Sequence, residues 1–292
     1  MLALTIYLYT KGGIGFEGVL TCTIAMMGSF GPVVALSSLS NNLNQTLASG
    51  ERVLSLLEEA PLVEEIPGDA ASGGDHAFAG AEAQNVTFAY EDETILDQYS
   101  LKLEPGKITG IHGASGSGKS TILKLLMRFW DVQTGRVSVD GADVREIPTK
   151  YLRDMESYVT QETHLFHDSI ANNIAIAKPG ATREEIMEAA KKASIHDFIM
   201  TLPNGYDTEV GELGDTLSGG EKQRIGIARA FLHDASMILL EPTSNLDSLN
   251  EGIILKSLKE SAEEKTIVLV SHRVSTMNVA DVVYEMENGR IS

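Results

Sequence analysis

Apolar residues are distributed unevenly along the chain, and their spacing separates a membrane-like segment from the rest. The run Gly18–Leu36 is apolar or small throughout. At about 1.5 Å rise per residue it is just long enough to cross a hydrocarbon core. A buried core helix of this length usually has a polar face, which this run lacks, so we favour a membrane-spanning helix. Apolar residues continue at helical spacing to Leu57, which predicts one long helix leaving the membrane.

Two other segments border this helix. Met1–Tyr9 is a second apolar run, too short to span a bilayer alone, and we interpret it as the end of another membrane helix. Glu58–Gly80 is acidic and rich in Pro, Gly and Ala, a composition typical of a linker. The chain is therefore expected to comprise a membrane part over 1–57, a linker over 58–80 and a further domain over 81–292.

In residues 81–292, short apolar runs alternate with segments of helical periodicity. This alternation predicts an α/β domain with a largely parallel sheet. The expected strands are Ala83–Phe88, Ile108–His112, Arg136–Val139, Tyr158–Thr160, Met237–Leu240 and Thr266–Ser271. The expected helices include Lys119–Arg128, Arg183–Ala193, Gly219–Leu232 and Leu249–Ser261.

The charge balance narrows the possible partners. The chain of 292 residues carries 23 Lys and Arg against 41 Asp and Glu, a formal net charge of −18. A surface of that sign repels phosphate backbones, so we expect no nucleic-acid partner. Cys22 is the one cysteine, so no disulfide can form within the chain.

The strongest chemical signal is the segment from Gly113 to Ser120, which fits the pattern G-x-x-x-x-G-K-[ST]. It lies directly between an expected strand and an expected helix, which is the context that this phosphate-binding loop requires. Its glycines let backbone N–H groups turn toward a phosphate, and the helix N-terminus adds partial positive charge. Lys119 would reach the terminal phosphates, and the Ser120 hydroxyl would bind Mg²⁺.

Further motifs follow in an order that resembles the ATP-binding cassette (ABC) transporters. Leu217-Ser218-Gly219-Gly220-Glu221 resembles the signature motif of that family, and Ser244-Asn245-Leu246-Asp247 resembles its D-loop. Tyr90 matches the A-loop aromatic, Gln161 the Q-loop and His272 the switch histidine. Thr208–Glu212 resembles the X-loop of exporters. The chain is similar to bacterial thiol (cysteine or glutathione) or multidrug exporter ATP-binding/permease proteins.

The resemblance assigns roles to individual residues. It implies a P-loop NTPase fold, with a RecA-like core of mainly parallel sheet, an antiparallel β part and a helical signature subdomain at about 163–235. Glu241, His272 and Gln161 are the expected catalytic residues, and Ser120 and Gln161 the expected Mg²⁺ ligands. The residues expected to bind ATP are Tyr90, Gly113, Ala114, Ser115, Gly116, Ser117, Gly118, Lys119, Ser120, Thr121, Ser218, Gly219, Gly220, Glu221 and Asp247.

The chain departs from the family pattern in one strand. The family has Asp and then Glu before Pro at the end of this strand, whereas here Leu240 precedes Glu241 and Pro242. Counted back from Pro242, Glu241 occupies the catalytic position; counted forward from Asp234, it occupies the Asp position. We favour the first alignment because the unit from Glu241 to Ser244 is intact. In either alignment, one carboxylate serves two tasks, metal binding and activation of water.

The resemblance implies an ATPase subunit of a membrane exporter that works as a head-to-tail dimer, either homo- or heterodimeric, and exports an unidentified small molecule. The membrane part would lie among lipids of the plasma or inner membrane, as part of a multi-pass protein whose earlier helices precede Met1, with a cytoplasmic nucleotide-binding domain. One alternative is a degenerate ATP-binding subunit or decayed fragment with little hydrolysis. Another, a soluble ABC ATPase, is opposed by the uncharged stretch from Gly18 to Gly50.

Overall fold

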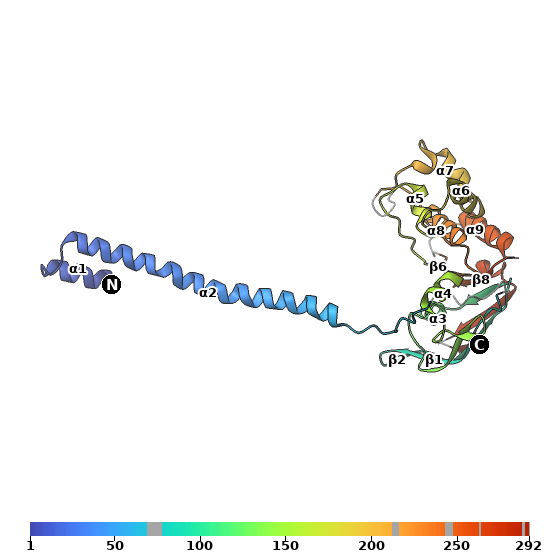
Figure 1. Ribbon diagram of the computed structural model, residues 1–292, viewed down its shortest axis with the longest axis horizontal. Coiled ribbons are helices and arrows are strands. Elements are labelled where there is room, and N and C mark those ends of the chain that lie inside the picture. The colour runs from blue at the N-terminus through green and yellow to red at the C-terminus, as the bar shows by residue number, and fades with distance from the viewer. Residues whose placement is uncertain (69–77, 212–215, 243–247, 263, 288–289, 292) are drawn as a thin grey trace. The chain divides into compact units, whose positions relative to one another are not determined.

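The computed structural model describes residues 1–68, 78–211, 216–242, 248–262, 264–287 and 290–291 (Figure 1). The chain forms two compact units, Met1–Pro61 and Leu62–Ser292. The second unit therefore begins within the segment that the sequence predicts as a linker. Ile66 exchanges hydrogen bonds with Thr149, donating to its hydroxyl at 3.0 Å and accepting from its N–H at 3.1 Å. This pair fixes Ile66, within the predicted linker, to the rest of the second unit.

The first unit consists of two helices, α1 (Leu2–Thr10) and α2 (Phe16–Glu58). The prediction of one long helix is confirmed, and α2 runs through Pro32 without a break in its assignment. Of the helices in the described residues, α2 is the one long and apolar enough to cross a membrane. Its large apolar side chains are exposed, as at Ile24 and Phe30. An apolar helix without protein around it is suited to a lipid environment.

The second unit contains the predicted parallel sheet, with strand order β10-β9-β3-β8-β7-β6. All adjacent pairs are parallel except β9 and β10, which are antiparallel. Its strands are β3 (Ile108–His112), β6 (Glu156–Val159), β7 (Met237–Leu240), β8 (Thr266–Ser271), β9 (Val282–Glu287) and β10 (Arg290–Ile291). Strands β7 and β8 are completely buried, as expected for a parallel sheet covered on both faces.

A second, antiparallel sheet has the order β2-β1-β4-β5. Its strands are β1 (Ala81–Tyr90), β2 (Glu93–Leu103), β4 (Thr134–Val139) and β5 (Ala142–Asp143). The antiparallel β part implied by the family resemblance is thus present. Strands β2, β5, β9 and β10 have no counterpart among the strands expected from the sequence.

Helices surround the sheets and gather mainly at one end of the second unit, where α5, α6, α7 and α8 lie away from β1 and β2 (Figure 1). The longer helices begin as the sequence predicts, to within one residue. The helices of this unit are α3 (Lys119–Leu126), α4 (Thr149–Met155), α5 (Ile170–Ala175), α6 (Arg183–Lys192), α7 (His196–Thr201), the 3₁₀ turn η1 (Gly205–Asp207), α8 (Gly219–His233), α9 (Ser248–Ser261) and α10 (Val274–Met277).

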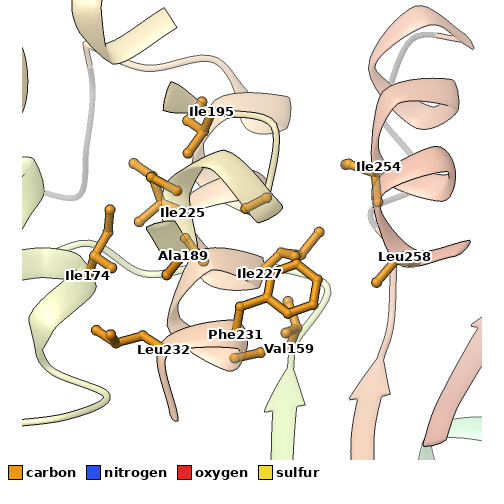
Figure 2. Packing of buried hydrophobic residues seen from close by; sticks show 14 of the residues in the cluster. Val159, Ile174, Ala189, Ile195, Ile225, Ile227, Phe231, Leu232, Ile254 and Leu258 are labelled. Carbon is orange, nitrogen blue, oxygen red and sulfur yellow. The ribbon is translucent and has the colours of Figure 1, made fainter. Parts of the chain in front are cut away.

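Helix α8 joins the helical end of the unit to the parallel sheet. Figure 2 shows Ile225 and Phe231 of α8 in the core, with Ile254 and Leu258 of α9 on the facing side. Strand residues such as Leu240 belong to the same buried cluster. Because one continuous core connects strands and helices, the loops at the strand ends are held on a rigid base.

Candidate nucleotide-binding site

The loop from Gly113 to Ser120 connects β3 to α3, as the motif requires. Gly118 is the N-cap of α3 and has φ of 101°, a left-handed conformation that favours glycine. A Cβ on Gly113 would lie 2.3 Å from the Met286 carbonyl oxygen, so no side chain fits there. The loop therefore depends on glycine for its course, and a loop of this kind followed by a helix N-terminus is suited to binding an anion.

Lys119 is folded back onto this loop. Its ammonium donates hydrogen bonds to the carbonyl oxygens of Gly113 at 2.8 Å and Ala114 at 2.5 Å, and to Ser117 Oγ at 3.2 Å. Burial lowers its pKa, and the nearby Glu241 carboxylate opposes that change. These contacts keep a positive charge at the loop, where a phosphate oxygen could replace one of the present acceptors.

The other pocket residues come from neighbouring strands of the parallel sheet. Gln161 follows β6, Glu241 follows β7 and His272 follows β8. With the loop they line one cavity of about 590 Å³, together with Ile95, Pro242, Val270 and Ser271. The carboxyl ends of parallel strands are the usual place for ligands in open α/β sheets. The structure thus brings together four of the motifs that are far apart in the sequence.

Glu241 is the one carboxylate among the described residues that line this cavity. Its backbone continues the strand, since its N–H donates to Val159 O at 2.9 Å and its carbonyl oxygen accepts from Gln223 Nε2 at 3.2 Å. Its Oε1 is buried and has no hydrogen-bond partner among the described residues. An unpaired buried carboxylate oxygen costs free energy, which a ligand with a positive charge or a donor would recover.

Tyr158 is a neighbour of Glu241 that the sequence analysis missed. Its pKa is raised by burial, and also by the charge of Glu241 and a hydrogen bond to that carboxylate. Tyr158 is opposite Leu239 in the pairing of β6 with β7. No sequence motif identifies it, because its role depends on strand pairing across a long sequence separation.

Tyr90 lies at the end of β1 in an aromatic cluster and not among the residues that line the cavity. Its ring packs edge-on against Phe88 at 4.8 Å and Trp130 at 5.2 Å between ring centroids. Lys124 Nζ lies over the Trp130 ring, 5.6 Å from its centroid. This packing fixes the Tyr90 ring and leaves it half-buried.

The residues of the signature-like motif are also outside the cavity. Ser218 is the N-cap of α8, where Glu221 N–H donates to its hydroxyl at 3.4 Å and the Ser218 N–H donates to Glu221 Oε2 at 2.7 Å. Ser218 and Gly219 are exposed, whereas Gly220 is buried. Asp247 and the D-loop-like segment lie outside the described residues, as does Glu212 of the X-loop-like segment.

Comparison with known proteins identifies the family. The ABC transporter family matches residues 96–244. The chain is 56% identical over 293 residues to a protein of Haemophilus influenzae named "Probable ABC transporter ATP-binding/permease protein", covering 100% of this chain and 52% of that protein. It is 38% identical to an ATP-dependent lipid A-core flippase of Syntrophus aciditrophicus, covering 91% of this chain and 44% of the flippase.

A solved structure gives the same result. A bacterial Atm1-family ABC exporter with ATP bound superimposes with a TM-score of 0.77 at 35% identity, covering 100% of this chain and 51% of the exporter. The chain thus spans about half the length of the relatives that it matches. The comparisons confirm the P-loop fold and the exporter resemblance, and they give no support to the degenerate alternative.

Proposed function

Since the chain belongs to the ABC transporter family, we propose that it is the ATP-binding part of an exporter subunit and that it hydrolyses ATP to drive transport. The observation that carries the proposal is the single cavity in which the loop from Gly113 to Ser120 meets Gln161, Glu241 and His272. The relatives named as ATP-binding/permease proteins and the ATP-bound exporter support it. A phosphate site of this kind explains how so acidic a chain could bind ATP, because the positive potential is local and comes largely from backbone groups.

Several groups of this chain are proposed to hold the nucleotide. N–H groups of the loop and the first turn of α3 would bind phosphate oxygens, with Gly113 to Thr121 forming the cradle and Lys119 contacting the terminal phosphates. Tyr90 would stack against adenine from its fixed position beside Trp130. The residues proposed for binding therefore come from both sheets of the second unit.

The oxygen-bearing side chains that line the cavity fit Mg²⁺, which prefers hard oxygen ligands. Ser120 Oγ and the Gln161 amide oxygen are proposed as its protein ligands, and the unpaired Glu241 Oε1 is the buried negative charge that a cation would compensate. When bound, Mg²⁺ neutralises charge on the phosphate oxygens.

Hydrolysis needs a base and a donor at the γ-phosphate. We assign the base to Glu241, which would accept a proton as the oxygen of water bonds to phosphorus and the bond to the bridging β,γ-oxygen breaks. His272 would donate a hydrogen bond to the γ-phosphate. The site thus combines a negative group for the water with positive and donor groups for the phosphate.

A second subunit completes the proposed site. The exposed N-terminus of α8, formed by Ser218 to Glu221, lies outside this chain's own cavity, so we propose that it covers the γ-phosphate bound to the partner. Asp247, which lies outside the described residues, is also proposed to contribute to ATP binding. The partner is a second ABC half-transporter, either another copy of this chain or a related one.

The first unit indicates where the protein works. We propose that α1 and α2 belong to the membrane part at 1–57 of a multi-pass exporter in the plasma or inner membrane. The linker at 58–80 would lead to a cytoplasmic nucleotide-binding domain at 81–292, with its helical subdomain at about 163–235. The cargo is an unidentified small molecule that contacts the membrane part.

The test uses the full 292-residue chain in detergent. ATP binding is measured by calorimetry and phosphate release by a coupled assay, each with and without Mg²⁺. We expect Mg²⁺-dependent release, and we expect Glu241→Gln to abolish release while ATP still binds. Glu260→Gln is the control, since this exposed carboxylate of α9 makes a long surface ion pair with Lys256, at 3.8 Å. Absence of ATP binding by the unmodified chain would overturn the proposal.

A further inference from the structure

The two residues on either side of His272 take part in one chain of hydrogen bonds. The Arg273 N–H donates to Ser271 Oγ at 3.0 Å, and Ser271 Oγ donates to Thr276 Oγ1 at 3.2 Å. Thr276 Oγ1 in turn donates to Glu251 Oε1 in a short contact. The backbone that carries His272 is therefore connected, through side chains, to one carboxylate on α9.

Glu251 also binds the same segment directly. Its Oε2 accepts from Arg273 Nη1 at 2.8 Å, and its Oε1 accepts from Ser275 Oγ at 3.4 Å. The Glu251 side chain is only 10% exposed. Burial alone would raise its pKa, but hydrogen bonds from Thr276 and Arg273 lower it below its ordinary value. A buried carboxylate with several donors is rigid, because any rotation leaves a charge unsatisfied.

The position of Glu251 along the chain relates its hydrogen bonds to the ATP-site cavity. Ser271 and His272 line the ATP-site cavity, as does Glu241. Helix α9, which carries Glu251, is the next helix after β7 and Glu241. Glu251 therefore ties the segment that carries one proposed catalytic group to the helix that follows the other.

We propose that Glu251 is a positioning residue for His272, holding the Ser271–Thr276 segment so that the His272 ring is presented to the terminal phosphate. This inference rests on the proposed function, because it needs ATP in the cavity. Glu251 itself does not line the cavity, so its effect on nucleotide passes through His272. Loss of the Glu251 charge should therefore weaken recognition of the γ-phosphate and leave binding of the rest of the nucleotide intact.

The experiment compares Mg²⁺–ATP with Mg²⁺–ADP, using the full chain in detergent and calorimetry. We expect Glu251→Gln to reduce the preference for ATP over ADP by about 10-fold, the size typical of coupling within one hydrogen-bond network, with ADP affinity unchanged. Glu251→Asp, which keeps the charge, should restore part of the preference. Glu260→Gln on the same helix removes an exposed carboxylate and should leave both affinities as they were.

A double-mutant cycle separates positioning from a general structural role. In the His272→Ala background, Glu251→Gln should change the ATP preference no further, because the group through which it acts is gone. Thermal unfolding is recorded for every variant, so a folding defect is detected separately from a change in binding. Equal losses of ATP and ADP affinity, or an undiminished effect of Glu251→Gln without His272, would overturn the inference. Failure of the unmodified chain to bind ATP would instead overturn the proposed function.

Discussion

Two helix N-termini in the second unit resemble each other in sequence and differ in how their N–H groups are used. Helix α3 follows a glycine-rich loop and has Gly118 as its N-cap, with no side-chain capping hydrogen bond. Helix α8 follows the Ser218 N-cap and has a complete capping box with Glu221. Helix α3 lines a cavity of about 590 Å³, whereas the start of α8 is exposed.

The difference shows that the two helix starts satisfy their N–H groups in different ways. Unpaired N–H groups at a helix start cost free energy unless water, a side chain or a ligand satisfies them. The capping box stabilises α8 in the isolated subunit, and the start of α3 leaves its donors to a phosphate. We infer that the start of α3 binds phosphate within its own chain and that the start of α8 contributes to the site of a partner subunit.

The largest effect on ATP affinity is expected from replacing Lys119, the charged group of the α3 site. Lys119→Ala should lower ATP affinity by about 10- to 150-fold, because a charged hydrogen bond contributes about 1.5–3 kcal/mol. Calorimetry on the full chain measures it, with the exposed Lys259→Ala on α9 as the matched control. Unchanged ATP affinity would contradict the assignment of the phosphate loop.

The next comparison is between Gly118, before α3, and Gly219, at the start of α8, and it concerns the stability of the fold. Gly118→Ala should destabilise the fold by about 1–2 kcal/mol, the cost of a left-handed conformation for an L-residue. The new Cβ would also lie 2.9 Å from Leu96 Cδ2. A Cβ on Gly219 meets no atom within 4 Å, so Gly219→Ala should unfold at the same temperature as the unmodified chain. Equal unfolding temperatures for the two variants would mean that the α3 loop is not constrained as described.

Replacing Ser218 tests whether the start of α8 contributes to the site of a partner subunit. Ser218→Ala should cost about 1 kcal/mol of stability through the lost N-cap and leave ATP binding to the single subunit unchanged. Nucleotide-dependent dimerisation, followed by light scattering with the Glu241→Gln variant, should be weakened. If Ser218→Ala instead lowered ATP affinity in dilute, monomeric protein, α8 would belong to this chain's own site.

The smallest expected effect is on the pH dependence of ATP affinity. Burial lowers the Lys119 pKa below the ordinary lysine value, so the ammonium loses its proton earlier than an exposed lysine as pH rises. As pH rises, the loss of ATP affinity should therefore start at a lower pH than the one at which exposed lysines lose their proton. Because the Glu241 carboxylate raises the Lys119 pKa, Glu241→Gln should move this fall to lower pH. An identical pH profile in both proteins would show that the two charges do not interact.

The local features of the site could be predicted because their residues are contiguous. The loop from Gly113 to Ser120 and its flanking strand and helix follow from one motif and the apolar run before it. Strand β2 was missed because its alternation is interrupted: Gln98 has φ of 51°, and the pairing of β1 with β2 shifts register several times. A pattern read with a period of two fails where bulges add a residue.

The sequence by itself determined the long apolar helix, the order of the motifs and the identity of the residues at each strand end. Those properties depend on hydrophobic periodicity and on short contiguous motifs, which need no knowledge of distant neighbours. Only the tertiary structure decided that Gln161, Glu241 and His272 share one cavity, that Ser218 does not line it, and that Glu251 holds the segment carrying His272. Strand order and helix packing determine which distant residues meet, because burial energy depends on the whole core and not on any single segment.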